Sequence, residues 1–178
     1  MKIAICGKMC SGKTTMAHTI MRMDKRYKVF SIGKKVKEVG TDLFGVTHKD
    51  RPLLISIGAK MREIDPDVWI KHVIAQTKNE THCIVDDLRY QNEYEHLRNN
   101  GFVFIRLHVS RLTQEQRVRK LYPQDFQEHL ENRDHLSEAV QIEWSDEPKV
   151  EVDNAEDRVV IQQRIHSFLQ RNENLVNS

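Results

Sequence analysis

The sequence predicts an α/β fold: a parallel sheet of five strands with helices on both faces, in three layers. Two observations lead to this fold class. Short apolar runs alternate along the chain with stretches in which apolar residues recur at helical spacing. The first apolar run also passes directly into a glycine-containing turn that opens a helical pattern. In such sheets ligands gather at the carboxyl ends of the strands, so functional residues are expected there.

The strands are predicted where apolar runs are short and are bounded by turn residues. In chain order they cover residues 3–6, 27–32, 82–87, 102–109 and 149–154. The fourth run is almost entirely apolar, as expected for a strand that is buried on both faces.

The helices are predicted from apolar residues at spacings of three and four. In chain order they cover residues 14–23, 34–44, 51–63, 67–78, 92–100 and 157–169. The whole chain is expected to form one domain, with a core of residues 1–33, 80–110 and 149–171 and a helical insertion over residues 34–79. The tail after Arg171 is polar and is expected to fray.

Composition excludes several classes of protein. The chain has 178 residues, of which 39% are hydrophobic, enough for one sizeable core. Its formal net charge of +2 is too small to argue for a nucleic-acid surface, and no apolar run approaches membrane-spanning length. Its 3 cysteines show no disulfide or zinc spacing, which favours a reduced, cytoplasmic setting. We therefore expect no membrane and no stable nucleic-acid partner, and a homodimer stays open.

The run Gly7–Thr15 has the glycine, lysine and threonine spacing of a phosphate-binding loop. Glycine at both ends lets the backbone approach phosphate oxygens, and the following helix adds its positive dipole end. In this pattern Lys13 reaches the β- and γ-phosphates, and the hydroxyl of Thr14 is placed to bind Mg²⁺. The predicted cofactors are therefore ATP and Mg²⁺. The candidate nucleotide-binding residues of this loop are Gly7, Met9, Cys10, Ser11, Gly12, Lys13, Thr14 and Thr15.

The third predicted strand ends in two carboxylates, Asp86 and Asp87. A carboxylate at this position can lie beside the metal in a phosphoryl-transfer site. Because neighbouring residues of a strand face opposite ways, only one of the two acids can point at the phosphates.

Two charged stretches are candidate substrate-binding segments. The helical insertion carries Lys37, Arg51 and Arg62 and is predicted to bind an acceptor, although ordinary solvated charges are the alternative, above all for the lysine. Residues 111–135, which include Arg111 and Arg117, show no clear apolar stripe and are predicted to form a mobile arginine-bearing lid. The alternative for this segment is a solvated helix with ion pairs four residues apart.

Four runs together resemble the deoxynucleoside monophosphate kinases of bacteriophages and large DNA viruses. These runs are Gly7–Thr15, Leu53–Trp69, Asp87–Glu93 and His135–Glu138. They follow one another in the order and at about the spacing of that family, across nearly the whole chain. The resemblance implies a P-loop kinase of the nucleoside monophosphate kinase fold that transfers the γ-phosphoryl group of ATP to a deoxynucleoside or nucleoside 5′-monophosphate, a small-molecule acceptor, and gives the diphosphate. If the protein is viral, it would act in the host cytoplasm.

The resemblance also implies residue roles. It places Asp87 and Arg89 between donor and acceptor, which favours Asp87 over Asp86 as the acid near the metal. It places Arg62 near the acceptor phosphate, and Trp69 in the acceptor pocket or, as we favour, in the core. Three catalytic residues are then expected: Lys13, Asp87 and Arg117.

Three further candidates have less defined roles. Asn154, before the last helix, resembles the adenine-side loop of related kinases. Arg111 is a second nucleotide-binding candidate in the lid, and Glu138 is an acceptor-binding candidate whose role stays open.

Two rival functions remain open on the sequence. One is a small-metabolite kinase on the same scaffold, such as a dephospho-coenzyme A kinase or a phosphomevalonate kinase. The other is a nucleotide-dependent module that processes nucleic acid, which the near-neutral total charge disfavours.

Overall fold

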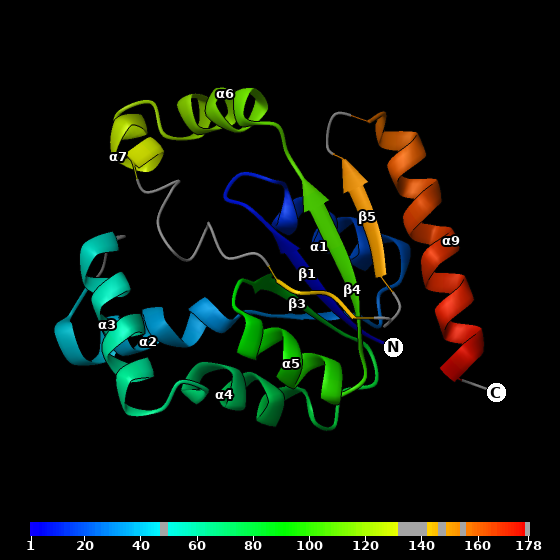
Figure 1. The fold of residues 1–178 in the computed structure, drawn as a ribbon, viewed down its shortest axis with the longest axis horizontal. Coiled ribbons are helices and arrows are strands. Elements are labelled where there is room, and N and C mark those ends of the chain that lie inside the picture. The colour runs from blue at the N-terminus through cyan, green and yellow to red at the C-terminus, as the bar shows by residue number, and fades with distance from the viewer. Residues whose placement is uncertain (47–49, 132–141, 146–148, 154–155, 177–178) are drawn as a thin grey trace.

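A computed structural model describes residues 1–46, 50–131, 142–145, 149–153 and 156–176 of the chain. Its centre is a five-stranded sheet, and every pair of neighbouring strands in it is parallel. The strand order is β2-β3-β1-β4-β5, so the first strand of the chain lies in the middle (Figure 1). The strands are β1 (Lys2–Gly7), β2 (Lys28–Phe30), β3 (Cys83–Leu88), β4 (Phe102–His108) and β5 (Lys149–Asp153). The predicted fold class is confirmed.

The helices connect the strands and extend beyond the sheet at two places. In Figure 1, α2 and α3 lie on one side of the sheet, whereas α6 and α7 lie above the ends of β1 and β4. The helices are α1 (Lys13–Met23), α2 (Ile32–Phe44), α3 (Arg51–Ile64), α4 (Val68–Thr77), α5 (Gln91–Asn99), α6 (Arg111–Leu121), α7 (Phe126–Glu131) and α9 (Arg158–Val176).

The sheet separates two hydrophobic clusters, because successive side chains of a strand point to opposite faces. Ile3 and Ile5 of β1 pack with α1 and α9, whereas Ala4 between them packs with α2, α3, α4 and α5. Strand β3 follows the same rule: Ile84 lies in the cluster with α1, and Val85 lies in the cluster with α2. This alternation determines which layer each functional side chain near the strand ends can reach.

The pairing of β1 with β3 is irregular where the two carboxylates lie. Ala4 pairs with Val85, but Cys6 pairs with Leu88, so one residue of β1 faces both Asp86 and Asp87. An extra residue of this kind is a β-bulge, which bends the strand and redirects side chains.

The C-terminal helix is longer than predicted, because α9 continues past Arg171 to Val176. A polar network near its end connects it to the sheet. Arg26 donates to Asp24 and to Glu173 of α9, and His82 lies 3.6 Å from Glu173. This network explains why the last turns remain helical despite their polar sequence. Among the described helices, none is long and apolar enough to cross a membrane.

Candidate active site

The phosphate-binding loop connects β1 to α1, and both of its glycines are required, for different reasons. A Cβ atom on Gly7 would lie 2.5 Å from the Ser11 hydroxyl oxygen and 2.9 Å from the Leu107 carbonyl oxygen. Gly12 has a φ of 95°, in the left-handed region that favours glycine. Cys10 also has a positive φ, of 58°, although it has a side chain. The loop is therefore held in a tight, unusual conformation.

The groups in the loop fit a phosphate ligand. The Ser11 hydroxyl is buried and, among the described residues, has no hydrogen-bond partner. The N-cap of α1 is Gly12, so no side chain caps the first amides of this helix. The Lys13 ammonium donates to the carbonyl oxygens of Gly7 and Lys8, and Thr14 and Thr15 are exposed on the first turn. Unsatisfied donors at a helix N-terminus form a site for anions.

Helix α6 is packed against this loop. The Gln114 side chain, 2% exposed, donates to the Met9 carbonyl oxygen over 2.8 Å. Arg117 donates to the Cys10 carbonyl oxygen over 3.0 Å, and Val118 is fully buried. The prediction that this part of the lid is not a packed helix is therefore wrong. The buried side-chain amide of Gln114 attaches α6 to the loop, so this helix packs without the apolar stripe that a packed helix was expected to show.

Arg117 thus lies at the phosphate loop, whereas Arg119 does not point there. Arg119 instead pairs with Glu115 over 2.9 Å, the i, i+4 pair that the alternative interpretation requires. Arg111 is exposed on the first turn of α6. The segment therefore combines one arginine at the site with solvated charges, and residues 132–135 of the predicted lid lie outside the described part of the chain.

A cavity of about 540 Å³ extends from the loop between α1, α6 and α9. Residues 9–15 line one end, with Arg117 beside them. The other end is lined by Thr19, Arg22, Tyr122 and Gln162, among others. A cavity with a phosphate cradle at one end and mixed polar and apolar walls at the other suits a nucleotide.

The two carboxylates at the end of β3 face different partners. Asp87 accepts hydrogen bonds from the Ser31 hydroxyl (2.7 Å) and from the backbone amides of Ile32 (2.8 Å) and Gly33 (2.7 Å). It therefore caps the N-terminus of α2, where the helix dipole also favours a negative charge. Three hydrogen bonds occupy most of its acceptor capacity.

Asp86 lies among different charges. Burial raises its pKa to about 6, and the neighbouring charge of Asp87 adds to the rise. The positive charges of Lys13 and Lys37 act in the opposite direction, which places Asp86 within electrostatic reach of the phosphate loop. Asp87 is held toward the start of α2 by its hydrogen bonds to Ser31, Ile32 and Gly33, whereas the charge of Lys13 acts on the pKa of Asp86. The preference for Asp87 as the metal-side acid rests on resemblance and stays a prediction, and the hydrogen bonds of Asp87 make Asp86 the alternative.

One acceptor-side candidate, Arg62, contacts the residues that follow β3. Arg62 of α3 donates to Glu93 over 3.2 Å and to the Gly58 carbonyl oxygen over 3.3 Å. Its guanidinium also lies 4.4 Å from the centre of the Tyr90 ring, a cation–π contact. The Asp87–Glu93 run and the helical insertion are therefore in direct contact. The resemblance implied roles for Arg62 and Arg89 but no contact between their segments.

The other residues predicted for the site do not form a group: one lies in the core, others lie on or near separate elements, and two lie outside the described residues. Trp69 is 3% exposed, belongs to the core cluster and donates to the Gly58 carbonyl oxygen, which corrects its place among the acceptor-binding residues. Lys37 is exposed on α2, Arg51 begins α3, and Arg89 is partly buried just after β3. Asn154 and Glu138 lie outside the described residues. Two residues with a position at the site, Gln114 and Glu93, were assigned no role from the sequence because a single polar residue on a helix carries no pattern.

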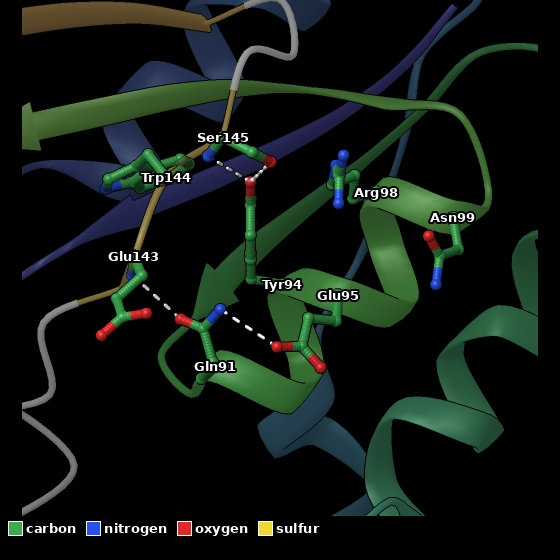
Figure 2. A pocket seen from close by; sticks show the side chains of 8 residues that line it. All are labelled: Gln91, Tyr94, Glu95, Arg98, Asn99, Glu143, Trp144 and Ser145. Atoms are coloured by element: carbon green, nitrogen blue, oxygen red, sulfur yellow. Dashed lines mark hydrogen bonds between the residues drawn. The ribbon is translucent and has the colours of Figure 1, made fainter.

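A second cavity, of about 470 Å³, lies between α5 and residues 143–145 (Figure 2). Its side chains already bond across the gap: the Tyr94 hydroxyl is 2.8 Å from that of Ser145, and Gln91 accepts from the Glu143 amide. Trp144 packs edge-on against Tyr94 and Phe104. These contacts attach residues 143–145 to α5 and the core, and none of the residues that line this cavity belongs to the phosphate loop.

The raised pKa of Asp86 predicts an effect on stability. Because the folded protein holds this proton more tightly than the unfolded chain does, the protonated carboxyl contributes to stability below about pH 4, and this contribution is lost as the pH rises toward the raised pKa of about 6. We expect Asp86→Asn to raise the melting temperature at pH 7.5 in EDTA, and to raise it less at pH 4.5. Thermal unfolding followed by circular dichroism measures both shifts, and equal shifts at the two pH values would contradict the prediction.

The comparisons with known proteins agree with this geometry. A family model described as an AAA domain matches residues 3–135. No curated protein matches the chain. A putative kinase from Chloroflexus aurantiacus is similar in structure, with a TM-score of 0.64, 20% identity and coverage of 96% of each chain.

Two further solved structures have the same fold. A gluconokinase from Sinorhizobium meliloti has a TM-score of 0.58 and 18% identity, covering 98% of this chain and 95% of its own. The APS kinase CysC of Mycobacterium tuberculosis, in complex with AMPPNP and APS, has a TM-score of 0.58 and 11% identity, covering 95% and 96%. The structural likeness gives the fold, that of P-loop kinases, and the match over residues 3–135 shows that the chain belongs to the AAA domain family.

Proposed function

We propose that this protein is an ATP-dependent phosphotransferase that passes the γ-phosphoryl group to a deoxynucleoside or nucleoside 5′-monophosphate and releases the diphosphate. The observation that carries the proposal is the arrangement of charge around β3. A phosphate cradle with Lys13 and Arg117 follows β1, while Arg62 is bonded to the segment that follows β3 and Arg89 belongs to that segment. The first group suits a triphosphate and the second suits a phosphorylated acceptor.

On the donor side, the loop amides and Lys13 hold the phosphates of ATP. Lys13 now bonds the carbonyl oxygens of Gly7 and Lys8 and would exchange these bonds for phosphate oxygens when ATP binds. Arg117 is already directed at the loop and stabilises the charge that spreads over the transferred group. The cavity between α1, α6 and α9 then receives the base and the sugar.

Hard oxygen ligands near the cradle fit Mg²⁺. The Thr14 hydroxyl is exposed on the first turn of α1, and the Asp86 carboxylate is held near Lys13. These two residues would hold the ion, and Asp87 would serve the site indirectly by fixing the start of α2. When bound, Mg²⁺ neutralises part of the charge on the β- and γ-phosphates.

On the acceptor side, Arg62 and Arg89 orient the phosphate of the second substrate for in-line attack. Arg62 uses two of its five N–H donors within the protein, which leaves donors for a phosphate. A nucleoside monophosphate has the monoester group that this pair suits. The near-neutral chain does not favour the nucleic-acid alternative.

A panel of acceptors tests the proposed substrate class. We expect kcat/KM for at least one nucleoside monophosphate to exceed that for each non-nucleotide acceptor by about 100-fold, or about 2.8 kcal/mol in the transition state. The panel contains the common ribo- and deoxynucleoside monophosphates together with gluconate, shikimate, dephospho-coenzyme A and phosphomevalonate. Reactions without acceptor give the background of ATP hydrolysis.

Gluconate and shikimate are included in this panel because solved structures with a similar fold are kinases named after them. One structure with a similar fold is the gluconokinase described above. Another is a shikimate kinase from Aquifex aeolicus, with 16% identity and a TM-score of 0.56, covering 97% of this chain and 98% of its own. If one of these acceptors outperforms every nucleotide, the enzyme is a small-metabolite kinase and the proposed acceptor class is wrong.

A further inference from the structure

Glu93 is a buried acid whose charge serves two different elements. It is the third residue of α5 and is 2% exposed. One carboxylate oxygen accepts from the backbone amides of Arg89 (3.0 Å) and Tyr90 (3.1 Å). The other accepts from the guanidinium of Arg62, on α3, over 3.2 Å.

An N-terminal cap of α5 does not require this arrangement. The two backbone bonds alone satisfy the orphan amides that precede the helix, and they use only one oxygen. The second oxygen is directed into the protein, at a residue 31 positions earlier in the chain. A buried carboxylate is costly unless it is paired, so its pairing with Arg62 is a specific contact.

Arg62 is also held from two other directions. Its second terminal nitrogen donates to the Gly58 carbonyl oxygen, and its plane lies over the Tyr90 ring. A Cβ atom on Gly58 would lie 3.4 Å from this nitrogen, which places the guanidinium directly beside the α3 backbone at Gly58. The side chain of Arg62 is nevertheless 26% exposed, so a ligand can reach it. Its orientation is therefore determined before any substrate arrives.

We propose that Glu93 is a positioning residue that fixes Arg62 and the backbone of Arg89 relative to each other, so that both arginines meet one phosphate monoester of the acceptor. This inference rests on the proposed function and adds a residue that does not touch substrate. Preorganised donors bind an anion without a further ordering cost, so loss of Glu93 weakens acceptor binding more than it slows the transfer step.

The variant Glu93→Gln tests this role without removing the cap. Its amide oxygen still accepts from Arg89 and Tyr90, but its NH₂ group cannot accept from Arg62. We expect the KM for the acceptor to rise about 10-fold, corresponding to about 1.4 kcal/mol, with kcat within threefold and the KM for ATP unchanged. The matched control is Glu95→Gln, an exposed acid on the same helix that bonds Gln91, for which all three constants should stay as in the wild type.

Two results would overturn the inference. One is an acceptor KM for Glu93→Gln within twofold of the wild-type value. The other is a lower kcat together with higher KM values for both the acceptor and ATP and a lower melting temperature. That pattern would indicate a structural role only. A double-mutant cycle adds a further condition: Arg62→Lys should weaken acceptor binding less in the Glu93→Gln background than in the wild type.

Failure of the proposed function gives a different pattern. If the wild type transfers phosphate to no acceptor, the function is wrong, and hydrogen exchange of the unliganded protein then decides about Glu93. Faster exchange of residues 58–62 in Glu93→Gln, with residues 89–90 still protected, supports the positioning of Arg62. Unchanged exchange at residues 58–62 overturns it.

Discussion

Lys13→Ala is expected to lower kcat for phosphoryl transfer by about 10²–10³-fold, the loss found when one preorganised donor to a developing charge is removed. Lys13 is the ammonium that lies inside the loop, bonded to the carbonyl oxygens of Gly7 and Lys8. Without it the loop amides still hold phosphate, but the charge on the γ-phosphoryl group is less stabilised. Coupled-assay turnover at saturating ATP and acceptor measures the loss.

The control for this variant is Lys8→Ala. The Lys8 side chain is exposed, and its backbone carbonyl, which Lys13 uses, is kept. Lys8→Ala should therefore turn over at the wild-type rate. Turnover of Lys13→Ala within about tenfold of wild type, or about 1.4 kcal/mol, would show that Lys13 has no catalytic role.

Asp86→Asn is expected to lower kcat by about 10²-fold and to raise the Mg²⁺ concentration needed for half-maximal activity. The reason is that Asp86 lies within electrostatic reach of Lys13. The same exchange at Asp87 gives a matched comparison, because the two acids are adjacent but have different partners. Initial rates across a Mg²⁺ titration measure both variants.

Asp87→Asn should behave differently. Its amide group cannot accept at every position where the carboxylate accepts from Ser31, Ile32 and Gly33, so the melting temperature should fall while the Mg²⁺ requirement stays near that of wild type. The reverse outcome, with the Mg²⁺ requirement changed by Asp87→Asn and not by Asp86→Asn, would assign the metal to Asp87.

The sequence predicts the fold well because hydrophobic alternation is a local signal. Ile3, Ala4 and Ile5 already indicate a strand with two buried faces, and the helical spacing of Met16, Ala17 and Ile20 indicates what covers one of them. The phosphate loop is also local, since Gly7, Gly12 and Lys13 lie within a few residues of one another. Parallel pairing then follows from the helices between the strands.

Other features depend on contacts that no local pattern contains. Gln114 docks α6 on the loop through one buried amide, so a helix without an apolar stripe is still packed. Glu93 and Arg62 are 31 positions apart and meet only when the insertion folds back.

The choice between Asp86 and Asp87 is an intermediate case. Simple alternation from Ile84 and Val85 would send the two acids to opposite faces, but the irregular pairing at this point and the hydrogen bonds of Asp87 are known only from the fold. The homodimer and the mobility of the lid remain predictions.

The central claim is that the cradle at Gly7–Thr15 delivers a phosphoryl group from ATP to a second phosphorylated nucleotide. Phosphorus-31 NMR of the wild-type protein with Mg-ATP and a mixture of deoxynucleoside monophosphates tests it most directly. The account predicts that the γ-phosphate signal of ATP falls while the two signals of a nucleoside diphosphate grow and one monophosphate signal falls equally. Growth of ADP and inorganic phosphate in equal amounts, with every monophosphate signal unchanged, would contradict it.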